Sequence, residues 1–189
     1  LTVGGTGRLT LGTANTYAGG TTLDDGTLIL GDASALGTGA LTVDGDSALS
    51  TTGALSVGND VDLLANLTVA GSQALTWGGN IGGTGGLIKS GAETLTLSGA
   101  NTYSGGTTIS AGTLQGNTTS LTGNIANNAQ LVFDQVATGT YAGVLSGGGA
   151  LSKTGGGNLI LSGVSTFSGA TSVEGGTLSV NGSLADSTI

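Results

Sequence analysis

Residues 99–108, GANTYSGGTT, decide the fold, because the same string returns twice in altered form. Residues 9–28 match residues 95–114 at 14 of 20 positions, with an offset of 86. Residues 87–114 match residues 151–178 at 14 of 28 positions, with an offset of 64. A chain built from copies of one unit is typical of a stacked array, because each unit buries its apolar face against its neighbours.

The two offsets indicate the size of the structural unit. They are close to four and three times a unit of roughly 21 to 22 residues, a length that solenoids use. We interpret that unit as one coil. Tyr17, Tyr103 and Phe167 hold the same place in the three copies, so we expect them at the same position of the coil, packed at a corner rather than forming a binding strip. Trp77 and Tyr141 are also related by the offset of 64.

Alternation of apolar and polar residues is the dominant local pattern, and it predicts strands with one buried face. The longest alternating run is Val61, Leu63, Ala65, Leu67 and Val69. Glycine-containing steps separate the short runs, and glycine suits such corners because it takes positive φ without steric penalty. We expect no helix beyond a single turn near residues 32–36.

These patterns predict an all-β fold, a right-handed single-stranded parallel β-helix (β-solenoid) of about 8–9 coils of roughly 21–22 residues. Parallel strands normally need helical crossovers, but in a solenoid each strand pairs with its equivalent one coil later. Strand twist and crossover preference favour the right hand. Leu95, Leu97 and Leu114 with their counterparts are the predicted core. We expect one solenoid domain over residues 1–189, with repeat copies near 1–30, 87–116 and 151–180.

The composition excludes several classes of protein. The 189 residues include 40 glycines but no proline, cysteine, methionine or histidine, and they lack the Gly-X-Y period of collagen. The net charge of −8, with Arg8, Lys89 and Lys153 as the only basic side chains, argues against nucleic acid and anionic membranes as partners. No apolar stretch is long enough to span a bilayer. The start at Leu1, without a signal peptide, indicates a segment of something longer.

Catalytic chemistry has few candidate residues. Without histidine or cysteine, neither a Ser-His-Asp or Cys-His arrangement nor a zinc site built on those ligands can form. Asp44/Asp46 and Asp60/Asp62 are spaced to project together, and paired carboxylates cleave polysaccharides in some enzymes. Such enzymes also need a cleft with sugar-binding aromatics, and the six aromatics here sit at repeat positions. We interpret the four aspartates as solvated turn and edge residues and predict no catalytic site.

Metal and cofactor sites are not predicted either. The strings GGTGRLTLG from Gly4 and GGTGGLIKS from Gly82 approach the calcium-binding nonapeptide but lack its aspartate. Weak calcium binding at Asp44/Asp46 stays open as an alternative. Glycine-rich runs also imitate a phosphate loop, but no strand-to-helix context supports that function. We therefore expect no metal and no cofactor.

The repeat resembles a known family. Residues 85–114, GGLIKSGAETLTLSGANTYSGGTTISAGTL, are similar to the passenger-associated transport repeat of bacterial autotransporters, the type V secreted proteins. Residues 30–43, 114–143 and 176–189 look like the segments that usually flank this repeat. The first copy departs from the pattern, because Val3 stands where the later copies have lysine.

The resemblance implies a function and a location. The chain would be part of the β-helical stem of a longer passenger, non-catalytic, exported across the bacterial outer membrane and located at the cell surface or secreted. It would support that export and present an effector region. Its expected partners are a C-terminal outer-membrane translocator barrel and an effector domain, and the segment itself is not expected to insert into a membrane. An adhesin or self-association module, with cell-surface or self-association partners, is the alternative. A polysaccharide-cleaving β-helix enzyme is a remote third.

Overall fold

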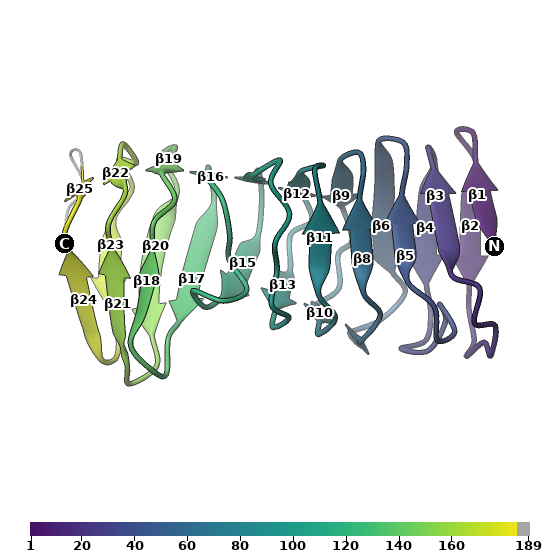
Figure 1. Ribbon diagram of the computed structural model, residues 1–189, viewed down its shortest axis with the longest axis horizontal. Coiled ribbons are helices and arrows are strands. Elements are labelled where there is room, and N and C mark those ends of the chain that lie inside the picture. Colours follow the sequence, from purple (N-terminus) through teal and green to yellow (C-terminus); the bar gives the residue numbers. More distant parts are fainter. Residues whose placement is uncertain (185–189) are drawn as a thin grey trace.

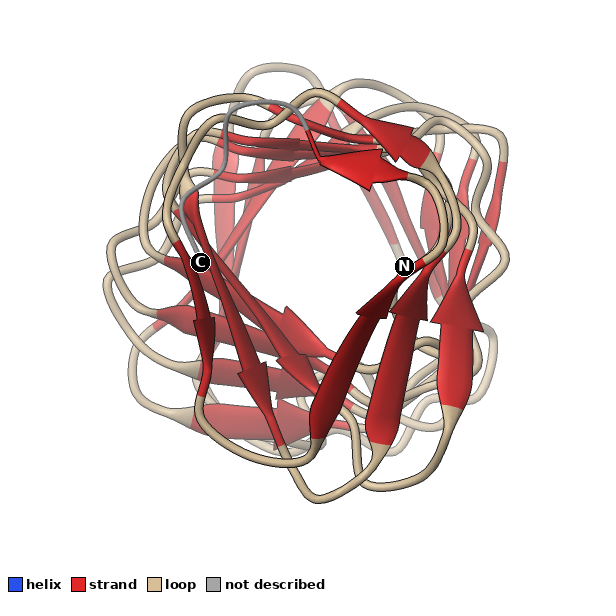
Figure 2. Ribbon diagram, turned by 90° about the vertical axis from the view of Figure 1, so that its left-hand side faces the viewer, coloured by secondary structure: helices blue, strands red, loops and turns tan. Residues whose placement is uncertain are grey.

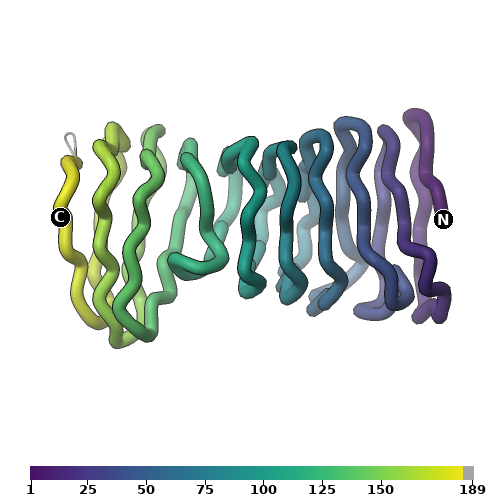
Figure 3. Tube along the Cα trace, in the orientation of Figure 1, coloured from purple at the N-terminus to yellow at the C-terminus, as the bar shows by residue number. Residues whose placement is uncertain are grey.

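The computed structural model describes residues 1–184 and shows a rod of stacked coils (Figures 1 and 3). Within these residues the chain forms 25 strands and no helix, so none of them lies in a membrane-spanning helix. The strand pairs are parallel, and the coils number about nine. In Figure 1 the front strands point upward while the chain advances from right to left, which is a right-handed winding. The predicted parallel β-solenoid is therefore confirmed.

The coil has three sides, which surround the interior when the rod is viewed end-on (Figure 2). Face A begins as a five-stranded sheet of β1 (Thr2–Gly4), β3 (Thr21–Asp24), β5 (Leu41–Val43), β8 (Val61–Leu63) and β11 (Ile81–Gly83). The next coil continues face A without a strand, where Thr102 N donates to Ile81 O at 2.8 Å. The face ends in a three-stranded sheet of β18 (Gly139–Tyr141), β21 (Asn158–Leu161) and β24 (Thr177–Val180).

Face B follows face A along the chain. Its eight-stranded sheet contains β2 (Arg8–Leu11), β4 (Thr27–Leu30), β6 (Ser47–Thr51), β9 (Leu67–Val69), β12 (Leu87–Lys89), β14 (Thr107–Ile109), β16 (Ile125–Asn127) and β19 (Leu145–Ser146). Thr166 N donates to Leu145 O at 2.8 Å, which carries the face on to the next coil. The last pair of strands on this face is β22 (Val164–Ser165) and β25 (Ser183–Leu184).

Face C closes the coil. Its seven-stranded sheet contains β7 (Leu55–Val57), β10 (Leu75–Trp77), β13 (Thr94–Leu97), β15 (Thr113–Gly116), β17 (Gln130–Asp134), β20 (Ala150–Thr154) and β23 (Thr171–Val173). In the first two coils this side is formed by residues 12–20 and 31–40 without strands. The expected turn near residues 32–36 is present there as hydrogen bonds from Ala35 N to Asp32 O and from Gly37 N to Ser34 O, and it does not extend into a helix.

Like residues stack on like residues through the interior. On face C an unbroken inward row joins six coils: Leu55, Leu75, Leu95, Leu114, Leu131 and Leu151. The predicted core residues Leu95, Leu97 and Leu114 are 1%, 2% and 0% exposed. Burial of this kind contributes about 1.5–3 kcal/mol per large apolar side chain. Since each coil contributes such side chains to its neighbours on both sides, the core runs the length of the rod.

The coil is slightly shorter than the offsets indicated. Paired residues are mostly 20 apart, as with Leu41 and Val61, and extremes are 17 (Thr113 with Gln130) and 21 (Thr27 with Ala48). The offsets of 86 and 64 are therefore not whole numbers of coils. The second copy lies four coils and one face beyond the first, and the third lies three coils and one face beyond the second.

The threonine that follows each repeat aromatic by four residues shows this rotation. Thr21 lies in β3 on face A, Thr107 in β14 on face B, and Thr171 in β23 on face C. Each copy is thus turned by about a third of a revolution from the previous one. The expectation that the three repeat aromatics share one position of the coil is wrong for this reason: the offsets were divided by a coil that was too long.

Candidate functional site

The first pair of predicted carboxylates lies at the corner between faces A and B. Asp44 and Asp46 are both exposed there. Asp46 Oδ1 accepts a hydrogen bond from Asn66 N in the next coil at 2.9 Å. Asn66 Oδ1 in turn accepts from Gly86 N one coil further on, at 3.0 Å. Asp46 is therefore the first step of a ladder of side-chain acceptors that joins three coils.

The second pair divides between two environments. Asp60 lies at the corner between faces C and A, and its Oδ1 accepts from Asn80 N at 2.8 Å. Asn80 Oδ1 then accepts from Ala100 N at 2.8 Å, so this corner carries a ladder of the same kind. Asp62 points outward from β8 and is exposed. Sequence reasoning missed both ladders, although Asp or Asn recurring 20 residues apart was a signal for them.

Asp46 and Asp60 serve as acceptors for backbone N–H groups. Among residues 1–184, no group of three or more histidine, cysteine, aspartate or glutamate side chains is arranged to hold a metal ion. Side-chain acceptors suit a corner, because backbone N–H groups that leave a sheet there still need partners. Asp44, Asp46 and Asp60 thus lie at corners, whereas Asp62 lies on the outer face of β8, an inner strand of its sheet.

Two of the three repeat aromatics, Tyr17 and Tyr103, make the same local contact on different faces. The Tyr17 hydroxyl lies 2.8 Å from Thr21 Oγ1, and the Tyr103 hydroxyl lies 2.7 Å from Thr107 Oγ1. Tyr103 and Phe167 are each 1% exposed. Burial raises the pKa of the Tyr103 hydroxyl, and its hydrogen bond to Thr107 partly opposes that shift. Because the three aromatics lie on separate faces, and Tyr103 and Phe167 are buried, they form no common binding strip.

Trp77 and Tyr141 also hold equivalent roles one face apart. Trp77 Nε1 donates to Asn59 O at 2.7 Å, and the Tyr141 hydroxyl donates to Gly123 O at 2.6 Å. Both acceptors lie 18 residues earlier, in the preceding coil. Burial raises the pKa of Tyr141, and the nearby Tyr103 adds to the shift. Each polar tip therefore bonds to a neighbouring coil instead of facing a ligand.

Two of the three cationic side chains are inside the solenoid. Lys89 is 2% exposed and is the last residue of β12, with its side chain inside the coil. Its Nζ donates to Gly91 O and, at 3.2 Å, to Ala111 O. Ala111 belongs to the next coil, so the ammonium joins two coils. Desolvation lowers the pKa of Lys89, and the charge of Glu93 opposes that shift.

Lys153 makes a wider set of contacts of the same kind. Its side chain is 0% exposed, and its Nζ donates to Gln135 O at 3.3 Å in the preceding coil. It also donates to Thr154 O at 2.5 Å and Gly155 O at 2.8 Å in its own coil, and to Gly175 O at 3.0 Å in the next. The sequence carried a signal for this burial, because each lysine is in phase with the inward leucine two residues before it.

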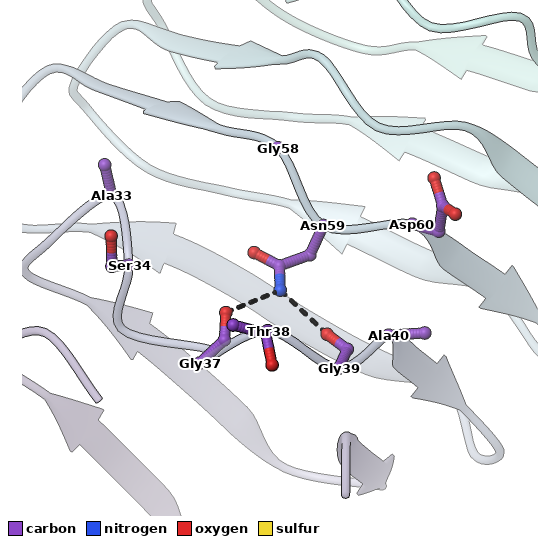
Figure 4. A pocket seen from close by; sticks show the side chains of 9 residues that line it. All are labelled: Ala33, Ser34, Gly37, Thr38, Gly39, Ala40, Gly58, Asn59 and Asp60. Atoms are coloured by element: carbon purple, nitrogen blue, oxygen red, sulfur yellow. Dashed lines mark hydrogen bonds between the residues drawn. The ribbon is translucent and has the colours of Figure 1, made fainter. Parts of the chain in front are cut away.

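A cleft of about 370 Å³ lies at the corner between faces C and A (Figure 4). It separates the loop of residues 33–40 from residues 58–60 of the next coil. Asn59 Nδ2 crosses it and donates to Gly37 O at 3.1 Å and to Gly39 O at 2.7 Å. Its lining offers hydroxyl groups and a single charged group, Asp60, whose Oδ1 is already engaged with the ladder. Asp60 is therefore the one titratable side chain among the residues that line this cleft.

Comparison with known proteins identifies the repeats of this chain. The family model described as passenger-associated transport repeat matches residues 1–30, 87–115 and 151–180. These three matches carry the buried lysines and the repeat aromatics. No solved structure matches the chain significantly.

One curated relative shares the sequence beyond the repeats. The protein named Adhesin BmaC autotransporter, from Brucella suis biovar 1 (strain 1330), is 42% identical over 171 residues, which is 78% of this chain. The chain spans 4% of the length of that relative.

Proposed function

This chain is a segment of an autotransporter passenger that carries passenger-associated transport repeats, and we propose that it works as the passenger's non-catalytic β-helical stem. In this role it supports export across the outer membrane by folding outside, and it holds an effector region away from the cell surface. The observation that carries the proposal is the unbroken leucine row from Leu55 to Leu151, which ties every coil it crosses to the next.

The stacked architecture suits a stem that folds coil by coil. Each coil pairs only with the coil before it and the coil after it, so each added coil gains hydrogen bonds and buried apolar surface on a template that already exists. The absence of cysteine means that no disulfide forms before the chain has crossed a membrane. The partners that this function requires are a translocator barrel in the outer membrane and an effector domain elsewhere in the full-length protein.

The proposed stem has no catalytic function. Asp46 and Asp60 accept backbone N–H groups at the corners, and histidine and cysteine are missing from the sequence. The rotation of the repeats supports the same view, because it points the equivalent outward residues of the three copies in three directions. Such an arrangement gives no single face on which repeated ligand contacts accumulate.

Surface display of the full-length protein that contains this segment tests the stem function. Leu97→Asp places a charge in the core of β13, whereas Ser104→Asp changes an exposed residue. With an epitope at the N-terminal end of the passenger, we expect Leu97→Asp to reduce protease-accessible epitope on intact cells severalfold and Ser104→Asp to leave it unchanged. Equal display of the two variants would show that folding of this segment does not assist export.

An adhesive function is the second candidate, because the relative that matches most of this chain is named an adhesin. Beads coated with the purified segment separate the two functions. Aggregation of the beads, or their binding to host cells, would make the segment adhesive in itself. Beads that stay dispersed and unbound would leave it with the stem function alone.

A further inference from the structure

The apolar pattern of this solenoid does not by itself fix how neighbouring coils align. Inward side chains recur at every second residue, so a slip of two residues between adjacent strands keeps the apolar side chains inside. On β17 the inward residues are Leu131 and Phe133, and either could lie opposite Leu151 in β20 without exposing an apolar side chain. Glycine-rich corners adapt to many turn geometries. A second determinant of alignment is therefore needed.

The buried lysines provide one in the interior, beside the ladders that join the coils at the corners. The ammonium of Lys153 bonds to carbonyl oxygens from three consecutive coils, at Gln135, Gly155 and Gly175. A two-residue slip of either neighbour would displace its carbonyl by about 6.6 Å along the strand, which is beyond hydrogen-bonding distance. The slipped state would then leave a buried cation short of partners, and a buried unpaired charge is strongly unfavourable.

We propose that Lys89 and Lys153 set the register in which their coils stack. Both hold the same place in their repeat copies and both bond to carbonyls at the corner that follows their strand, although these are different corners of the rod. Val3 holds the equivalent place in the first copy and carries no such group. The register function goes beyond the stem function and is independent of it.

The contribution of these lysines is to specificity more than to net stability. Removing a cation from water costs free energy that its new contacts return only in part, and replacing buried ionic groups by apolar ones is often neutral or stabilising. A buried polar group does, however, penalise every alignment in which its partners are missing. Lys153→Met keeps the length of the side chain and removes the charge. This variant therefore separates specificity from stability.

Disulfide trapping in the full chain measures the register directly, because the natural sequence has no cysteine. Ser152 and Ser172 are paired neighbours in the observed register. A two-residue slip would bring Ser152 opposite Glu174 instead. Cysteine pairs at 152/172 and at 152/174 thus report the native and the slipped alignments, each under mild oxidation during refolding.

With Lys153 present we expect the 152/172 pair to cross-link and the 152/174 pair to remain reduced. In Lys153→Met the ratio of native to slipped cross-link should fall by about tenfold, since one unsatisfied buried group changes a population by roughly that factor. Leu151→Val is the matched control: it weakens the core of the same strand but retains the ammonium, so its ratio should equal that of the wild type.

The same measurement at Lys89 gives an independent second test. Ile88 pairs with Thr108 in the native register, and a slip would place it opposite Ser110. Lys89→Met should raise the 88/110 cross-link relative to 88/108. Native cross-linking alone in both methionine variants would overturn the proposal. Loss of folding in both, with Leu151→Val folded, would also overturn it, because the lysines would then act through stability.

Discussion

Tyr103 lies on face A and Phe167 on face B, although the two residues hold the same place in successive copies of the repeat. Both rings are buried, and both precede by four residues a threonine on the following face. The repeat therefore specifies a local arrangement of strand, corner and ring that fits any of the three sides. What the copies share is this local arrangement, and this explains why their sequences agree although the copies face different sides of the rod.

The buried leucine core predicts that a new charge destabilises the solenoid strongly inside and little at the surface. Leu97→Asp should destabilise the solenoid by at least about 3 kcal/mol, because it removes a buried side chain and buries a carboxylate. Ser104→Asp, at an exposed position, should stay within about 0.5 kcal/mol of the wild type. Thermal melts of the purified chain followed by circular dichroism test this difference. Equal melting temperatures would contradict the assignment of Leu97 to the core.

The contact between Tyr103 and Thr107 predicts a measurable coupling. Tyr103→Phe reproduces the ring found naturally at Phe167 and removes one buried hydrogen bond, so it should cost about 1 kcal/mol. Thr107→Val should cost a similar amount. The double variant should cost less than the sum, because each single change leaves the other hydroxyl without its partner. Denaturant melts of the four proteins give the coupling energy, and strict additivity would mean that the hydroxyls act independently.

The corner ladder predicts local protection of the backbone. Asn80→Ala removes the acceptor for Ala100 N, which should cost about 1–2 kcal/mol. Hydrogen exchange at the Ala100 amide should accelerate more than exchange at the core strands. Thr76→Ala, an outward change on β10, is the control and should leave both quantities nearly unchanged. Unaltered exchange at Ala100 in Asn80→Ala would exclude the ladder as its source of protection.

The buried Tyr141 predicts a loss of stability in alkali. Its pKa is raised in the folded state, so the folded protein keeps a proton that the unfolded chain loses above the ordinary tyrosine value of about 10. The unfolded state then binds fewer protons, and the stability contributed by this group is present below pH 10 and falls as the pH rises further. Lys89, with a lowered pKa, contributes a slope of the opposite sign as the pH rises towards 10.5. Unfolding free energies of Tyr141→Phe and wild type across this range should converge as the pH rises, and parallel curves would refute the assignment.

Local patterns were sufficient to predict the architecture. The alternation around Val61–Val69 and the recurrence of the glycine-bounded unit identified short strands, stacking and the leucine core, because these features depend on residue type and spacing alone. The single turn near residues 32–36 was predicted from the same local patterns. The sequence did not determine the coil length. The offsets of 86 and 64 fit whole coils of about 22 residues, but they also fit coils of about 20 residues if each offset includes an additional third of a coil.

The functional details depended on three-dimensional context. Lys89 and Lys153 are recognisable in the sequence as cations, but the sequence does not show the carbonyl groups of adjacent coils that accept their hydrogen bonds and allow their burial. Asp46 and Asp60 appeared as paired acids with Asp44 and Asp62, whereas the acceptor ladders connect them to asparagines one coil away. Sequence spacing shows which residues are near along the chain, and these ladders join residues that are near only across it.

The advance of one face per repeat also constrains how such a rod can grow. A gene duplication that inserted another block of this kind would lengthen the rod and also swing everything beyond it around the long axis by roughly 120°, as the strand positions of Thr21, Thr107 and Thr171 already illustrate. Only a third such insertion would return the distal part to its original orientation. Relatives that differ in repeat number should therefore differ in the rotational orientation of their distal parts about the long axis. A difference of three repeats leaves that orientation unchanged.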